Sequence, residues 1–371
     1  MDQSGDKQQV LRELGYVKDF KAKNDEINLR ADVDVKLTFL KGKNDAELRV
    51  KLSGMSVDNS ISNSLRRAVM QYVPVYGFTR SNIVINSSKS YNMYTNDMIY
   101  NQIESLPIFD IPNNFDLEDP NVYLSKNKIM VKLFGHYAQQ KMTHAQIVDA
   151  ESVLEDGKEL LDIELVVNHK NNTDSDYFVS THTAILKING VLSDSYMTRD
   201  PIEFMVLKPG EEIYLKAKAN IGMDILNSSY EACTHAFHRK IDDMTYHLWY
   251  ESFGQLENKT ILKKACQIIV RKLEFFKIYM QEEYGEASIG NKIEINLYGE
   301  NHTIGLLIAT ALQKCKYTAK AGYSVPHPLR DSIRIVYSMA DGSKRDPIKV
   351  LIKCVDYIIR VYNSIMEQIN E

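Results

Sequence analysis

The chain has 371 residues, of which 44% are hydrophobic and 25% charged, as in a folded protein with a sizeable core. Its formal net charge of −4, from 45 Lys plus Arg and 49 Asp plus Glu, gives no electrostatic footprint of a stand-alone nucleic-acid binder, which usually has a strongly basic face. No apolar run reaches the roughly 18 residues of a membrane-spanning helix, and the N-terminal residues lack the hydrophobic centre of a signal peptide. We therefore expect an intracellular protein without membrane contact.

The cysteines occur singly, so their spacing predicts neither a zinc site nor a disulfide framework. We interpret all four as reduced core thiols: Cys233, Cys266, Cys315 and Cys354. Residues 1–30 are polar and mixed in charge, which is typical of a loosely attached arm. After them, the alternating segments VDVKLTFL and ELRVKLSG flank a turn-prone stretch at residues 42–45 and predict a β-hairpin.

A helix is predicted over residues 58–73, DNSISNSLRRAVMQYV, around which the rest of the chain is organised. Asp58 or Asn59 can cap this helix, and Pro74 stops it. Arg66 and Arg67 lie off its apolar face, so on the residues alone they are either solvated or available to a partner. The buried face is the stripe Ile61, Leu65, Val69 and Tyr72.

The stretch SNSLRRAVMQYVPVYGF resembles the first motif of the assembly platform of cellular RNA polymerases. That family comprises the N-terminal domain of the bacterial alpha subunit and the third-largest-type subunit of eukaryotes and archaea. The resemblance implies that Asn63, Arg66 and Arg67 bind a larger subunit. Residues 96–109 resemble a further motif of the family, which has an acidic residue, a helix with an arginine, and an Ile-Pro-Leu end. Here Gln102 stands where the family carries the arginine.

Alternating segments separated by polar loops predict a β-rich module within residues 111–240. The segments are KIMVKLF at 128–134, LDIELVV at 161–167, HTAILKI at 182–188 and EEIYLKAKA at 211–219. The end of this module resembles the inserted domain of the polymerase subunit, with Tyr230 in place of the usual tryptophan. Relatives often hold zinc or an iron-sulfur cluster there. Cys233 stands alone, so we predict an insert without a metal or cofactor.

A strand over residues 245–254 leads into a long helix from Asn258, whose apolar positions alternate by four and three. These are Leu262, Cys266, Ile269, Leu273, Phe276 and Met280. Such a stripe indicates packing against another helix, the alternative being an ordinary core helix. Residues 281–291 are polar with two glycines and predict a linker.

The pattern then repeats over residues 292–371 as a strand, a helix, two strands and a final helix opened by Asp346 and Pro347. The stripe of the final helix is Leu351, Val355, Ile358, Tyr362, Ile365 and Ile369. Aligning the shorter helices of the two copies places Asn59 over His302, and Arg66 and Arg67 over Ala309 and Thr310. Two such units in one chain predict a pseudo-twofold dimer.

The second copy also resembles a family, because ENHTIG and AGYSVPHPL are similar to motifs of the eleventh-type polymerase subunit. This resemblance implies partner contacts through His302, Thr303 and His327. Leu306 and Ala309 replace the asparagine and arginine of that family. Both motifs in one chain resemble the fused subunits of large cytoplasmic DNA viruses.

A catalytic role has little support in the sequence. The acidic residues Asp32 and Asp34 suit a solvated strand edge better than a magnesium site. His302 and His327 lack a nucleophile signature, and no glycine-rich phosphate loop is present. We keep two alternatives open: a self-contained nucleotide-handling enzyme and a regulatory DNA-binding protein.

We therefore predict an α+β fold with two polymerase-alpha-like units, the first formed by residues 31–110 and 241–280 and interrupted by the insert. The helix stripes pair within the chain through Leu262, Ile269, Leu273 and Phe276 on one side and Leu351, Val355, Ile358 and Tyr362 on the other. The resemblance implies a non-catalytic platform that binds the two largest and some small polymerase subunits and meets DNA only through the complex. Because the stripes pair within one chain, we expect the isolated chain to be a monomer. The resemblance further implies a location in the host cytoplasm, at viral factories, and in the virion.

Overall fold

The computed structural model describes residues 33–89, 94–111, 161–284, 292–327, 332–340 and 345–370. The expected arm at 1–30 and the expected strand at 128–134 lie outside these ranges. The described residues form several antiparallel sheets with helices packed on them, in agreement with the predicted α+β class. None of their helices is long and apolar enough to cross a membrane.

The first sheet has the strand order β1-β2-β11-β10 and includes the predicted hairpin. Its strands are β1 (Lys36–Leu40), β2 (Glu47–Ser53), β10 (Cys233–Asp242) and β11 (Thr245–Ser252). The helices α2 (Asn59–Gln71) and α7 (Asn258–Tyr284) pack against it. Between β2 and α2, Gly54 has a φ of 128° and lies so close to Asp34 that any side chain would collide with its carbonyl.

The second sheet has the order β12-β14-β13. Its elements are β12 (Lys292–Tyr298), α8 (His302–Lys314), β13 (Thr318–Ser324), β14 (Ser332–Met339) and α9 (Pro347–Asn370). In chain order, its strands are arranged first-third-second, as are β2, β10 and β11 of the first sheet. In both units the shorter helix follows the first strand and the long helix follows the third, so the topology repeats.

The two short helices agree residue by residue. Both α2 and α8 have 13 residues, and they begin at Asn59 and His302, the residues that the sequence alignment placed together. Each has a side-chain N-cap, because Asp58 accepts from the N–H of Ile61 and Asn301 accepts from the N–H of Thr303. Buried and exposed positions also follow the same order along both helices, with Arg66 and its buried counterpart Ala309 as one departure.

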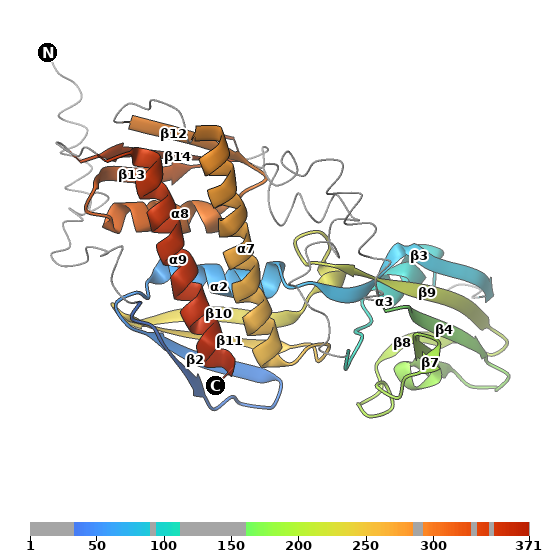
Figure 1. Cartoon of the computed structure of the whole chain (residues 1–371). Helices are drawn as coiled ribbons and strands as arrows, with labels where there is room; N and C mark the ends of the chain where they lie inside the picture. Colours follow the sequence, from blue (N-terminus) through green and yellow to red (C-terminus); the bar gives the residue numbers. More distant parts are fainter. Residues whose placement is uncertain are drawn as a thin grey trace, which may run out of the picture.

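The region predicted as the insert, together with β3 and α3, has a sheet and a buried cluster of its own. The sheet order is β3-β9-β4-β6-β7, from β3 (Val75–Lys89), β9 (Glu212–Gly222), β4 (Ile163–Lys170), β6 (Ile185–Ile188) and β7 (Val191–Leu192). A second pair joins β5 (Tyr177–Ser180) to β8 (Glu203–Leu207), and the helix α3 (Asn96–Glu104) packs on β3. Figure 1 shows this module beside the first sheet, away from the second unit.

The expected domain boundaries do not coincide with the division between the buried clusters. The elements β3 and α3 pack with the predicted insert, because β3 pairs with β9 and Phe78, Ile83, Ile99 and Ile103 belong to the same buried cluster, although we assigned both elements to the first unit. Conversely, β10 pairs with β11 in the first sheet, although most of it fell within the expected insert. The helix α7 also continues to Tyr284, so residues 281–284 of the expected linker are helical. Alternation predicts a strand but not the sheet that it joins, and the helix runs on to the last residue before Gly285.

Gln255 connects the predicted insert to the segment between β11 and α7 through hydrogen bonds with Tyr76. Its side chain accepts from the N–H of Tyr76 at 2.6 Å and donates to the carbonyl of Tyr76 at 2.8 Å. Nearby, the N–H of Asp110 donates to the carbonyl of Gly254, and Arg199 forms an ion pair with the Asp110 side chain at 2.9 Å. The insert is thus held at the point where β11 turns into α7.

Candidate assembly interface

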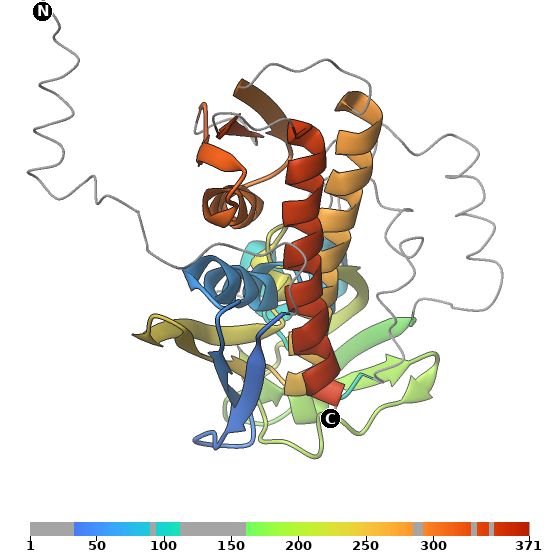
Figure 2. The ribbon, with the colours of Figure 1, turned by 60° about the vertical axis from the view of Figure 1, so that its left-hand side comes forward.

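The long helices α7 and α9 lie side by side and cross the shorter helices α2 and α8, as both views of the ribbon show (Figures 1 and 2). The two predicted stripes are buried over their whole length. Both stripes belong to one cluster that also contains the apolar faces of α2 and α8. The four helices therefore share a single core between the two sheets.

Helices α2 and α8 run antiparallel, because each has its beginning near the other's end. Lys314, the last residue of α8, forms a 2.7 Å ion pair with Asp58 at the start of α2. At the opposite end, Asn301 Nδ2 donates to the Tyr72 hydroxyl at 2.5 Å. Burial alone would raise the pKa of the Asp58 carboxyl, but Lys314 and hydrogen bonds from Ser60 and Ile61 keep that pKa below its usual value.

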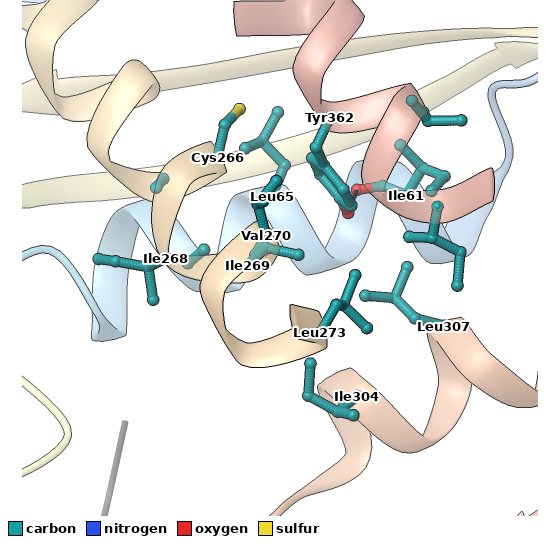
Figure 3. Packing of buried hydrophobic residues seen from close by; sticks show 14 of the residues in the cluster. Ile61, Leu65, Cys266, Ile268, Ile269, Val270, Leu273, Ile304, Leu307 and Tyr362 are labelled. Atoms are coloured by element: carbon teal, nitrogen blue, oxygen red, sulfur yellow. Dashed lines mark hydrogen bonds between the residues drawn. The ribbon is translucent and has the colours of Figure 1, made fainter. Parts of the chain in front are cut away.

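The long helices each reach across to the short helix of the other unit. The Tyr362 hydroxyl of α9 donates to the carbonyl of Ile61 in α2 at 3.2 Å, inside the core. In Figure 3, Leu273 of α7 points toward Ile304 and Leu307 of α8. Tyr362 and Leu273 occupy corresponding positions in the two stripes, and so do Ile61 and Ile304 in the short helices. The two crossings therefore join corresponding positions of the helices.

The predicted partner-binding residues separate into different places. Arg67 Nε donates to Thr303 Oγ1 at 2.7 Å, so these two residues bind each other across α2 and α8. Arg66 Nε instead donates to Asn63 Oδ1 at 3.0 Å on the same helix. The structure thus brings Asn63 and Arg66 together, and Arg67 and Thr303 together, but it does not join all four.

The two predicted histidines are both exposed. His302 Nδ1 lies 3.3 Å from the Tyr323 hydroxyl, and the two rings meet edge to face. His327 lies in the segment after β13. This contact of His302 joins α8 to β13.

Sequence reasoning missed His238 of β10, which borders Arg66. Its Nε2 lies 3.1 Å from the Asn59 Oδ1, and burial together with the Arg66 charge lowers the pKa of the imidazole. Burial and the neighbouring Arg67 likewise lower the pKa of the Arg66 guanidinium. Asn59, Asn63, Arg66 and His238 form a polar site on the outer side of α2, which we call the α2 outer site. No motif in the sequence indicates a role for His238.

A buried ion pair was also missed. Lys272 Nζ of α7 lies 3.1 Å from Glu300 Oε1, and both side chains are at most 1% exposed. The same ammonium lies 5.2 Å from the centre of the Tyr72 ring. The available sequence signals are weak: Lys272 adjoins the stripe residue Leu273, and Glu300 precedes the cap of α8.

The described residues contain neither a metal-binding group of side chains nor a disulfide. Within these ranges no group of three or more His, Cys, Asp or Glu side chains is arranged to hold a metal ion. All four cysteines are free and buried, as predicted for core thiols. Asp34 is exposed just before β1, and its carboxylate accepts from the N–H of Met55 at 2.8 Å in the turn before α2. Asp32 lies outside the described residues.

Comparison with known proteins agrees with this picture. Residues 292–368 match the RNA polymerase Rpb3/Rpb11 dimerisation domain. Over 345 residues the chain is 45% identical to a putative DNA-directed RNA polymerase subunit of Acanthamoeba polyphaga mimivirus, covering 92% of this chain and 96% of the relative.

Archaeal relatives match a shorter part of the chain. It is 41% identical over 71 residues to the DNA-directed RNA polymerase subunit Rpo11 of Saccharolobus shibatae, covering 19% of this chain and 75% of the relative. It is 38% identical over 79 residues to the Rpo11 subunit of Sulfurisphaera tokodaii, covering 21% of this chain and 83% of the relative. These similarities confirm the resemblance indicated by the motifs. The chain belongs to the family of DNA-directed RNA polymerase subunits that carry the Rpb3/Rpb11 dimerisation domain.

Proposed function

We propose that this chain is the non-catalytic assembly platform of a DNA-directed RNA polymerase, on which the two largest, catalytic subunits associate. In this proposal the two related units pair within the chain as a pseudo-dimer, and the insert extends from the first unit. The observation that carries it is the single buried cluster in which α2, α7, α8 and α9 of both units bury their apolar faces. A shared core of this kind gives a large partner one rigid surface to bind.

We further propose that the α2 outer site contacts a large subunit through Arg66. The guanidinium is a planar donor that suits a carboxylate or a backbone carbonyl. Asn63 holds it in place through the 3.0 Å hydrogen bond, and its partial burial reduces the screening of its charge. Arg67 and Thr303, which bind each other, contribute by fixing α2 against α8. His302 and His327 form a second contact area on the other unit.

The cellular setting follows from the same proposal. Small polymerase subunits bind the platform as well, and DNA meets it only within the assembled enzyme. As an isolated chain the protein is a monomer, because its two units pair with each other and leave no unit to pair with a second chain. It acts in the host cytoplasm at viral factories and is packaged in the virion, as a subunit of a viral enzyme would be.

The test is co-expression of the tagged chain with the two large subunits of its polymerase. We expect both to be retained on the tag, and the purified chain alone to incorporate no nucleotides with any template or magnesium concentration. Failure to retain either large subunit would overturn the platform function. Template-dependent RNA synthesis by the chain alone, abolished by Asp34→Asn, would make it an enzyme instead.

A further inference from the structure

The buried pair Lys272 and Glu300 has no charged counterpart in the other half of the interface. By the alignment of α2 with α8, the position before the N-cap is Val57 in the first unit and Glu300 in the second. By the alignment of the long-helix stripes, the position of Lys272 in α7 is that of Val361 in α9. All four residues are at most 2% exposed and so lie inside the fold. The ion pair Lys272–Glu300 in one half of the interface therefore corresponds to the two valines, Val361 and Val57, in the other half.

This asymmetry distinguishes the two possible kinds of pairing. When the first unit pairs with the second, Lys272 meets Glu300, and Val57 and Val361 lie at the equivalent place. Two first units paired in the same geometry would bury Lys272 against Val57. Two second units would bury Glu300 against Val361. Each homotypic pairing thus loses the ion pair and leaves a charge in the core, which is strongly unfavourable.

We propose that the Lys272–Glu300 pair is the specificity element of this interface, by which each unit accepts the other and rejects a second copy of itself. The fitting partner of the first unit is a fold that carries a buried carboxylate just before the N-cap of its short helix. The inference rests on the pseudo-dimer of the proposed function, and it adds the residues that determine partner choice. Specificity of this kind uses a penalty against the wrong partner as well as attraction to the right one.

The first experiment is a double-mutant cycle in the full chain with Lys272→Val, Glu300→Val and both together. We expect each single variant to lower the melting temperature by roughly 5 °C or more, because one buried charge loses its ion-pair partner. The double variant recovers most of this loss, because two valines occupy the equivalent place in the other half. Lys277 and Asp356 provide the control, since their 2.7 Å ion pair joins α7 to α9 at a partly exposed position. Valine variants of this pair should show little coupling.

The second experiment measures partner choice directly. A protease site placed within residues 285–291 of the full chain is cleaved after folding, the nicked protein is incubated until fragments exchange, and native mass spectrometry counts the pairs. The unmutated nicked protein should contain one fragment of each kind in every complex. The nicked double valine variant should form homotypic pairs as well, because it has lost at least about a tenfold preference for the right partner, equivalent to about 1.4 kcal/mol of discrimination.

Two outcomes would overturn the inference: homotypic pairs in the unmutated nicked protein, or strictly heterotypic pairs in the double valine variant. If a single variant fails to fold, the pairing of fragments in the double valine variant still tests the inference. The outcome is independent of capture, because pairing is measured on the chain alone. Loss of large-subunit capture with heterotypic pairing intact would overturn the platform function and leave this inference standing.

Discussion

Arg67 donates from Nε to Thr303 Oγ1 over 2.7 Å, and this hydrogen bond joins the two units across α2 and α8. Its neighbour Arg66 instead donates to Asn63 on its own helix. Two arginines that are adjacent in one motif thus have different surroundings. Arg67 is hydrogen-bonded to Thr303 within the chain, and Arg66 lies in the α2 outer site.

Substituting the two arginines separately should show that one contributes to the stability of the fold and the other to the capture of a large subunit. Arg66→Ala should change the free energy of unfolding by less than about 0.5 kcal/mol but weaken capture of a large subunit by well over tenfold. Arg67→Ala should cost about 1.5–3 kcal/mol of stability, because the buried Thr303 hydroxyl loses a hydrogen bond from a charged group. Urea unfolding and a pull-down measure the two effects. Unchanged capture by the Arg66 variant would mean that this residue is only surface.

The Asp58–Lys314 ion pair should make stability depend on pH in the acid range. The pKa of Asp58 is lowered in the folded chain from an ordinary value of 3.8. Its contribution is therefore complete above about pH 4 and is lost as the pH falls through the folded-state pKa. Asp58→Asn keeps the helix cap but removes the charge, so it should cost roughly 1–3 kcal/mol at pH 7. The difference between the two proteins should shrink below pH 3.8, which chemical unfolding at several pH values measures.

The hydrogen bond from Tyr362 to Ile61 should contribute measurably to the pairing of α9 with α2. Tyr362→Phe removes only the hydroxyl, so we expect a loss of about 0.5–1.5 kcal/mol in the free energy of unfolding. Tyr357→Phe is a suitable control, because Tyr357 lies on the same helix and is only partly buried. Equal effects of the two changes would show that the Tyr362 hydroxyl has no special role.

The sequence predicted the helices and their buried faces well, because a stripe such as Leu262 to Met280 is a local property of the chain. Capping was equally local: Asp58 and Asn301 stand directly before their helices. The alignment of Asn59 with His302 needed no structure either, since both helices begin at these residues. Local patterns thus predicted elements, caps and the repeat.

Features that depend on distant contacts were not predictable. The strand β3 alternates as any strand does, and only its pairing with β9 assigns it to the insert. Lys272 and Glu300 are 28 positions apart in the numbering of the chain, and each looks like a surface charge until the fold buries it. The different environments of Arg66 and Arg67 likewise depend on where α8 lies. Partner-binding roles for these residues stay predictions until capture is measured.

The pairing of the two long helices can be tested with one charge placed in the shared core. Ile358 of α9 is 2% exposed, so Ile358→Asp puts a carboxylate among apolar side chains without a partner. The expected cost is several kcal/mol, because a buried charge must be desolvated or neutralised. The exposed Lys353 lies on the same helix, and Lys353→Asp should be nearly neutral.

The decisive readout uses a chain cut within residues 285–289 after folding. The fragments of the unmutated protein and of the Lys353→Asp variant should co-elute in size-exclusion chromatography, since the shared core needs no covalent link. The fragments of Ile358→Asp should separate, because the penalty then acts on association rather than on a tethered contact at millimolar effective concentration. Unmutated fragments that part on dilution would contradict a single-chain pseudo-dimer, as would an intact chain that dimerises through α7 and α9.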